Sequence, residues 1–486
     1  MPAAPDAVGL VLSGGGARAS FQIGALRYLY DEVGIAPSVI TGTSAGSIIA
    51  AVLAQTADRE GQRRSLDNLE RLFREMTSSS DMFEELPWFT RLRERGPVWM
   101  ETLERRRRRQ GALGRSFKRV ADLRHGATDA AAVTVPPTKL TPDGDDAPAE
   151  VPAEPQEEAS WIPGRLLESI EMLRTVGRAS SDLEAIVGGA RQERSMFRPG
   201  PLVDRLLEPD VFRPEAVAQS GVALRIAVVA LESGELRYVT ETGALVDRQN
   251  RPLSDGSSAD VVEAVRASCA IPTVFPPVRL GGENYVDGGV RESLPAEVAM
   301  THLGVGTCYA VVAGPSGVTR EPSFDDRDMF SIVMRTTTAI MTDEVQRDEV
   351  QWARAAGAVV IEPEFDVHDT LTIEPGLVAI AMDYGYLRAA EAHLGATDEE
   401  RALVRDVVLL RRRIWRAEEE AFGEDRGEEE RLQRVAAITG LKFELRDLLR
   451  RLPAERLPEG AEEWWRGWEH HTMAIPVAPS WAPARV

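Results

Sequence analysis

The sequence is poor in cysteine and strongly acidic, and each feature excludes a class of protein. Cys269 and Cys308 are its two cysteines in 486 residues, so we expect neither a disulfide framework nor a cysteine metal site. Two thiols in so long a chain also indicate a reducing compartment. The net charge of −20 at pH 7 argues against a nucleic-acid partner, because proteins that bind nucleic acids usually present a broad basic surface.

Long apolar segments are lacking as well. No apolar run approaches the roughly 20 residues that a membrane-spanning helix needs. Residues 1–6 have neither the basic region nor the apolar core of a secretory signal. We therefore expect a cytoplasmic protein, or one that contacts a membrane surface from the cytoplasm. The chain is long enough for two or three domains, or for one large domain with insertions.

Two glycine-rich turns lie near the start of the chain. The first reads SGGGAR and spans residues 13–18, and the second reads GTSAG and spans residues 42–46. Each turn follows a short apolar run, typical of a buried strand, and precedes a segment with helical spacing of its apolar residues. This alternation predicts the beginning of an α/β fold, and we expect the two turns to face one another and form one site.

The second turn has the spacing Gly-x-Ser-x-Gly, with Gly42 and Gly46 on either side of Ser44. At a corner between a strand and a helix, this spacing is typical of a nucleophile elbow. Glycines flank the serine there because the tight turn leaves no room for neighbouring side chains. We expect Ser44 to be a nucleophile; the simpler alternative is a tight corner at which Ser44 caps the following helix.

Asp287 is the predicted base for this serine. It follows a hairpin predicted over residues 278–286 and precedes Gly288 and Gly289, where the backbone turns sharply away from the carboxylate. Partial burial raises the proton affinity of a carboxylate, so an aspartate can act as a base without a histidine. Taken alone, the Asp-Gly-Gly sequence would be an ordinary turn.

A Ser-His-Asp esterase is the alternative, since a histidine usually takes the proton of a catalytic serine. None of the six histidines lies in a turn with recognisable supporting chemistry. They are His125, His302, His368, His393, His470 and His471.

The first turn offers the backbone N–H groups of Gly14, Gly15 and Gly16 as an oxyanion hole. It lacks the Gly-Lys-Ser/Thr ending of a P-loop and the last glycine of a dinucleotide fingerprint, which argues against nucleotide binding. Arg18 either steadies the loop, attracts an anionic head group, or forms a structural salt bridge. The proposed chemistry needs no metal and no organic cofactor.

Taken together, residues 13–18, 42–46 and 287–289 resemble the three ordered motifs of the patatin-like phospholipases. The segment 268–276, with its prolines, is similar to what that family places before its aspartate. The resemblance implies a Ser–Asp lipid acyl hydrolase, with Ser44 as nucleophile, Asp287 as base and Gly14–Gly16 as oxyanion hole. Two departures are visible: Ala19 replaces a frequent glycine, and Ser293 replaces a frequent asparagine, which puts the support of the Asp287 loop in question.

For the fold, we predict an α/β three-layer sandwich with a mainly parallel central sheet. Residues 1–57 and 200–365 would form the patatin-like core, and residues 366–486 a helical C-terminal region. The insertion 58–199 would contain helical segments, a basic stretch over 91–124 and a disordered part over 126–160, which is rich in Pro, Ala, Asp and Glu. We also expect Ser258 to cap the helix that begins near residue 260.

The leading hypothesis is therefore a serine acyl hydrolase that cleaves phospholipids or related acyl esters and contacts a membrane surface transiently. The alternative from another class is a catalytically silent scaffold that binds membranes or partners. The basic stretch either binds anionic lipid or is solvated and paired with the acidic stretch after it. The tryptophans of the tail either anchor the protein at an interface or pack a C-terminal helix onto the core.

Overall fold

A computed structural model describes residues 7–91, 192–200, 211–318, 335–422 and 428–469, with a few short stretches between them (189, 204–205, 208–209, 320–321, 323–325 and 332). The chain divides into two compact units. One contains Met1–Phe89, Gly188–Pro322 and Met334–Val486, and the other contains Thr90–Val187 and Ser323–Val333. The second unit lies almost entirely outside the described residues, as do the predicted disordered stretch and nearly all of the basic stretch. The described residues belong almost entirely to the first unit.

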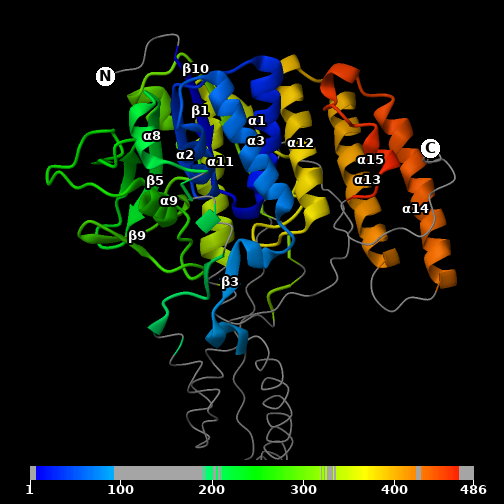
Figure 1. Cartoon of the computed structure of the whole chain (residues 1–486), viewed down its shortest axis with the longest axis horizontal. Coiled ribbons are helices and arrows are strands. Elements are labelled where there is room, and N and C mark those ends of the chain that lie inside the picture. Colours follow the sequence, from blue (N-terminus) through cyan, green and yellow to red (C-terminus); the bar gives the residue numbers. More distant parts are fainter. Residues whose placement is uncertain are drawn as a thin grey trace, which may run out of the picture. The chain divides into compact units, whose positions relative to one another are not determined.

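The first unit is built on a mixed sheet of nine strands (Figure 1). The order β11-β10-β1-β2-β5 is parallel throughout, and β6, β7, β8 and β9 add antiparallel pairs. The strands are β1 Val8–Leu12, β2 Val39–Thr43, β5 Ala223–Ala230, β6 Leu236–Thr240, β7 Leu245–Val246, β8 Val278–Leu280, β9 Glu283–Asp287, β10 Thr307–Val311 and β11 Val359–Ile361. A separate two-stranded sheet pairs β3 Phe83–Glu85 with β4 Phe197–Pro199. The mainly parallel sheet was predicted, and the structure confirms it.

Helices cover both faces of the sheet, so the unit has three layers. Leu10 and Leu12 of β1 pack into the apolar cluster that contains α1, α2, α3 and α12, whereas Val11 between them packs with α11 on the opposite face. Strands buried on both faces are nearly continuous in apolar residues, as the β1 sequence VGLVL shows. These helices are α1 Ala19–Tyr28, α2 Ala45–Leu53, α3 Arg59–Glu75, α11 Met341–Ala355 and α12 Pro375–Leu394.

Two shorter helices precede β5 and β8 in the chain, and the second of them packs against β5 and β9. They are α8 Pro214–Gln219 and α9 Val261–Ser268. The cap predicted for α9 was wrong: Asp260, not Ser258, caps it, with its carboxylate accepting hydrogen bonds from the N–H groups of Val262 and Glu263 at 2.8 and 3.2 Å. Ser258 instead forms an isolated β-bridge with Ala244, which keeps it away from the helix end.

The helix α12 packs directly on α1, backbone against backbone. A Cβ at Gly24 would overlap the carbonyl oxygen of Met382, and one at Gly385 would overlap that of Phe21. Figure 1 shows the two helices side by side, α1 in blue and α12 in yellow. Glycine is therefore required at both positions by the close approach of the two helices. Through this contact α12, at the start of the predicted C-terminal region, becomes part of the core.

The remaining helices are α13 Asp398–Phe422, α14 Glu428–Leu449 and α15 Glu463–Arg466. Arg411 of α13, only 2% exposed, forms ion pairs with Asp383 of α12 and with Glu469 at 3.0 and 2.9 Å. Its guanidinium lies 4.0 Å from the ring centre of Trp464. The ring of Trp468 covers the buried ammonium of Lys442 in the same way. These two tryptophans of the tail thus pack onto the helices, while Trp481 lies outside the described residues.

No helix among the described residues combines the length and the hydropathy that crossing a bilayer requires.

Candidate active site

Ser44 stands at the corner between β2 and α2, in a strained backbone conformation. Its φ and ψ are 53° and −130°, a region that residues with a Cβ rarely adopt. A Cβ at Gly42 would lie 2.6 Å from the carbonyl oxygen of Gly46, and one at Gly46 would lie 2.5 Å from that of Ser13. The corner can therefore form only with glycine on both sides of the serine.

The sheet register brings Asp287 to this corner. Along one edge of β5, Ala227 pairs with Thr43 of β2, and the next residue, Val228, pairs with Asp287 of β9. Because Ser44 directly follows Thr43, the end of β2 and the end of β9 meet at this point. The Ser44 side chain lies beside the Asp287 carboxylate, close enough to favour the ionised form of the carboxyl. Two residues more than 240 positions apart thus form a contact fixed by main-chain pairing.

The Asp287 carboxyl is almost completely buried, with 5% of its surface exposed. Burial raises the pKa of Asp287 to about 6, against the opposing effect of the nearby Ser44 side chain and of the Gly289 N–H, which donates a hydrogen bond to the carboxylate at 2.8 Å. The N–H of Asp287 donates to the carbonyl of Ala270 at 3.0 Å. Gly288 passes so close to β5 that a Cβ there would lie 2.6 Å from the Ala227 carbonyl oxygen. The carboxylate is thus held in place, and its pKa lies close to neutral pH.

The Gly14–Gly16 loop lies against Ser44. A Cβ at Gly14 would lie 3.2 Å from the Cβ of Ser44. The three amides of the loop differ, however: the N–H of Gly14 donates to the carbonyl of Ser293 at 3.1 Å. The N–H groups of Gly15 and Gly16 have no hydrogen-bond acceptor in the described part of the chain. The N–H groups of the second and third glycines are therefore unbonded within the described residues, while that of the first fastens the loop.

Ser268 is a residue of the site that sequence reasoning did not single out. Its hydroxyl accepts a hydrogen bond from the N–H of Ser44 at 2.9 Å and donates one to the carbonyl of Ala227 at 2.7 Å. It therefore ties the strained corner to β5. The segment that begins with Ser268 resembles the family in sequence, but no spacing rule relates Ser268 to either motif, so its role could not be read from the sequence.

The loop after Asp287 is supported from α11. The Glu349 carboxylate accepts hydrogen bonds from the N–H groups of Ser293 and Leu294 at 3.0 and 2.8 Å. The Ser293 hydroxyl donates to Gln346 at 3.3 Å, so the serine that departs from the family pattern still has a side-chain partner. Buried Glu292 accepts a hydrogen bond from the Tyr238 hydroxyl, and its carbonyl accepts one from Thr43 at 3.1 Å. This loop therefore joins the elbow, the base and the Gly14–Gly16 loop.

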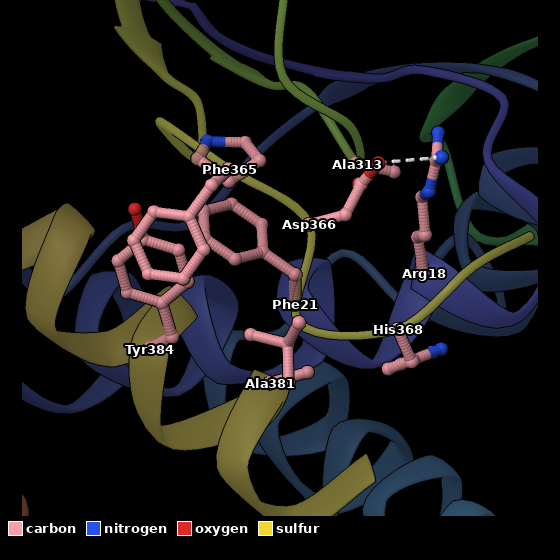
Figure 2. A pocket seen from close by; sticks show the side chains of 10 residues that line it. Arg18, Phe21, Ala313, Phe365, Asp366, His368, Ala381 and Tyr384 are labelled. Atoms are coloured by element: carbon pink, nitrogen blue, oxygen red, sulfur yellow. Dashed lines mark hydrogen bonds and ion pairs between the residues drawn. The ribbon is translucent and has the colours of Figure 1, made fainter. Parts of the chain in front are cut away.

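Arg18 forms a structural ion pair. One of its guanidinium nitrogens lies 2.7 Å from the Asp366 carboxylate (Figure 2). Both side chains line a small pocket, whose apolar wall includes Phe21, Phe365 and Tyr384. With a volume of about 10 Å³, this pocket has room for about one water molecule and cannot hold a lipid. Ser44 and Asp287 do not line it.

Two histidines of the described residues have partners other than Ser44. His368 Nε2 lies 3.1 Å from the hydroxyl of Ser20, and His393 Nδ1 lies 3.0 Å from that of Tyr28. His302 lies on the helical turn Val298–His302, on the face of the sheet opposite α1. His125, His470 and His471 lie outside the described residues. Among the described residues there is also no group of three or more acidic, histidine or cysteine side chains suited to a metal ion.

Comparison with known proteins now places the chain in a family. A family model described as patatin-like phospholipase matches residues 10–300, which is more than half of the sequence. The chain therefore belongs to the patatin-like phospholipase family. Membership supports lipid acyl hydrolase activity as the general class of function.

Individual relatives are similar over a short segment. A patatin-like phospholipase domain-containing protein, ZK370.4, from Caenorhabditis elegans is 49% identical over 53 residues, which cover 11% of this chain and 4% of that protein. Lysophospholipase nte1 from Aspergillus niger is 55% identical over 51 residues, or 10% of this chain and 3% of that protein. The matches thus span only a few per cent of these curated relatives.

Solved structures are more distant. VipD from Legionella pneumophila is 14% identical with a TM-score of 0.26, over 96% of this chain and 91% of that one. Human GIVD cytosolic phospholipase A2, in complex with methyl gamma-linolenyl fluorophosphonate, is 13% identical with a TM-score of 0.25, over 73% of this chain and 43% of that one. At these TM-scores neither likeness carries a conclusion about this chain.

Proposed function

We propose that the protein is a serine acyl hydrolase that cleaves fatty-acyl esters of phospholipids or related lipids through a Ser44–Asp287 dyad. The observation that carries the proposal is the sheet register that places Ser44, with its strained backbone, beside the buried carboxylate of Asp287. A carboxylate whose pKa is about 6 is ionised at neutral pH, yet takes up a proton far more readily than an exposed aspartate. Family membership supports the lipid substrate class.

In the proposed first half-reaction, Asp287 accepts the proton of the Ser44 hydroxyl as Oγ attacks the ester carbonyl. The oxygen of the tetrahedral intermediate would receive hydrogen bonds from the N–H groups of Gly15 and Gly16. Each such donor is worth roughly 10²–10³ in rate. The intermediate then expels the lipid alcohol, which takes the proton from Asp287, and an acyl ester remains on Ser44.

In the second half-reaction, water gives a proton to Asp287 and attacks the acyl ester. The fatty acid leaves, and the proton returns to Ser44. No metal or organic cofactor enters this scheme. Because such lipids reside in membranes or micelles, the proposal includes transient contact of the protein with a lipid surface.

A fluorophosphonate probe tests the proposal, since it reacts with activated serines. We expect the pure protein to be labelled at Ser44 and Ser44→Ala to stay unlabelled at equal folding. Ser220→Ala, which alters a serine at the end of α8, is the matched control and should label normally. An unlabelled but folded wild type would favour the silent scaffold instead.

The substrate can be identified in a second experiment. The protein and Asp287→Asn are incubated with the same mixed lipid extract, and the remaining lipids are measured by mass spectrometry. Lipids consumed by the wild type alone would give the head group and the acyl position. Equal consumption by the two proteins would contradict a role of Asp287 as base.

A further inference from the structure

The segment of residues 366–370, between β11 and α12, holds the Gly14–Gly16 loop and the start of α1. These parts of the chain are about 350 positions apart. Three contacts join them: the Ala17 N–H donates to the Thr370 carbonyl at 2.9 Å, the Arg18 guanidinium pairs with Asp366 at 2.7 Å, and the Ser20 hydroxyl lies 3.1 Å from His368 Nε2.

The approach of this segment to the loop is close. The backbone at Gly16 has a φ of +56°, and a Cβ there would lie 2.5 Å from the Thr370 carbonyl oxygen. Glycine is therefore required at this position for two reasons, its conformation and the neighbouring main chain. A glycine loop has little stiffness of its own, so contacts of this kind decide where its N–H groups point.

The contact between His368 and Ser20 is buried and directional. His368 is 7% exposed and Ser20 is fully buried. His368 Nδ1 lies 3.0 Å from the carbonyl oxygen of Asp369, which can only accept, so Nδ1 carries the proton. Burial lowers the pKa of His368, which favours the neutral ring. In that form Nε2 accepts a hydrogen bond from the Ser20 hydroxyl, which also lies 3.2 Å from the carbonyl oxygen of Ala17.

The ion pair between Arg18 and Asp366 is a second side-chain contact that holds the loop. Figure 2 shows Asp366 directed toward the Arg18 guanidinium, with His368 farther along the same segment. Arg18 and Ser20 follow the last of the three glycines by two and four positions. The last turn of the loop is therefore held by two side-chain bonds to one segment.

From these contacts we infer that His368 and Asp366 are positioning residues that hold the Gly15 and Gly16 N–H groups toward the oxyanion. The inference rests on the proposed function, because an oxyanion forms only if Ser44 attacks an ester. Neither residue touches the dyad. They act through Ser20 and Arg18, so their loss should weaken transition-state stabilisation more than ground-state binding of the substrate.

The test uses the full chain and a p-nitrophenyl ester of a medium-chain fatty acid. We expect Ser20→Ala and His368→Ala each to lower kcat by roughly 10–100-fold, the usual cost of a misplaced catalytic group, with KM changed less than about twofold. The double variant should be no slower than the slower single variant, because both remove the same bond. His368→Gln, whose amide can still bond to Ser20, should recover most of kcat.

His393→Ala is the matched control. His393 bonds to the hydroxyl of Tyr28, the last residue of α1. This bond, like the one between His368 and Ser20, joins α1 to a residue late in the sequence, but it lies at the opposite end of the helix. We expect its kcat to stay within about twofold of the wild type. Asp366→Asn, which removes the charge of the ion pair, should lower kcat in the same direction as His368→Ala.

Two results would overturn the inference: wild-type kcat in both Ser20→Ala and His368→Ala, or an equal fall in His393→Ala. If His368→Ala does not fold, Ser20→Ala and His368→Gln carry the same test, since each preserves the packing. Failure of the proposed function would look different. The wild type itself would then show neither turnover nor fluorophosphonate labelling of Ser44.

Discussion

The hydroxyl of Ser268 accepts a hydrogen bond from the backbone N–H of Ser44 at 2.9 Å. Both residues are buried, and the same hydroxyl continues to the carbonyl of Ala227. Ser268→Ala would leave the Ser44 amide without an acceptor, at a cost of about 1–3 kcal/mol in the free energy of unfolding. We also expect slower labelling of Ser44. Chemical denaturation and the rate of Ser44 labelling test this role. An unchanged free energy of unfolding together with an unchanged labelling rate in Ser268→Ala would contradict it.

The strain at Ser44 gives a second prediction. With φ at 53°, the position suits glycine, and strain of this kind costs about 1–3 kcal/mol. Ser44→Ala and Ser44→Gly both remove the proposed nucleophile, so neither should be labelled. Ser44→Gly should nevertheless be more stable than Ser44→Ala by about 1 kcal/mol, because only glycine relieves the strain. Equal stability of the two variants in urea would argue against a strained corner.

Burial of Asp287 makes a third prediction, on stability. Its pKa is about 6 in the folded protein, compared with about 4 for an exposed aspartate. The folded state therefore binds more protons between these values, so this residue lowers the free energy of unfolding as the pH rises from about 4 to about 6. Above about pH 6 the free energy of unfolding stays lower by this amount. Asp287→Asn should thus gain about 1–3 kcal/mol at pH 8 and little at pH 4.

A gain in stability on replacing Asp287 distinguishes it from an ordinary ion-paired aspartate, whose removal destabilises the protein at neutral pH. Urea unfolding of the wild type and of Asp287→Asn at the two pH values measures the difference directly. A variant less stable than the wild type at pH 8 would show that Asp287 contributes to the fold as a stabilising charge.

The contact between α1 and α12 gives a fourth prediction. Gly385→Ala would drive a methyl group into the Phe21 carbonyl and should cost about 3 kcal/mol or more. Gly440→Ala is the control: it alters an exposed glycine of α14 with no atom within 4 Å of the added carbon, and should gain about 0.5–1 kcal/mol. Thermal unfolding of both variants tests the packing. Similar melting temperatures would contradict it.

Much of the fold could be predicted from local patterns. The runs before Gly14 and Gly42 are short and apolar, and helical spacing follows each, so β1, α1, β2 and α2 are where the sequence places them. The hairpin β8–β9 that carries Asp287 follows from two apolar runs around Gly281-Gly282 in the same way. Each of these elements is specified by residues within about ten positions of itself.

The contacts between the parts could not be predicted in this way. That Val228 pairs with Asp287 while Ala227 pairs with Thr43 depends on the register of β5 with two partners, and no local signal sets it. The same holds for Ser268 at the elbow and for His368 at Ser20, since both contacts join segments more than 200 positions apart. Gly14 shows the same limit: its amide, expected to be a free donor, is bonded to Ser293.

The pH dependence of Ser44 labelling by a fluorophosphonate tests the central proposal most directly. If Asp287 is the base, the rate should fall about tenfold per pH unit below a midpoint near pH 6 and level off above it. Asp287→Asn should be slower by roughly 10²–10⁴ at pH 8 and should lose that midpoint. An unchanged midpoint in Asp287→Asn, or its loss on replacement of any one histidine, would contradict the Ser44–Asp287 dyad.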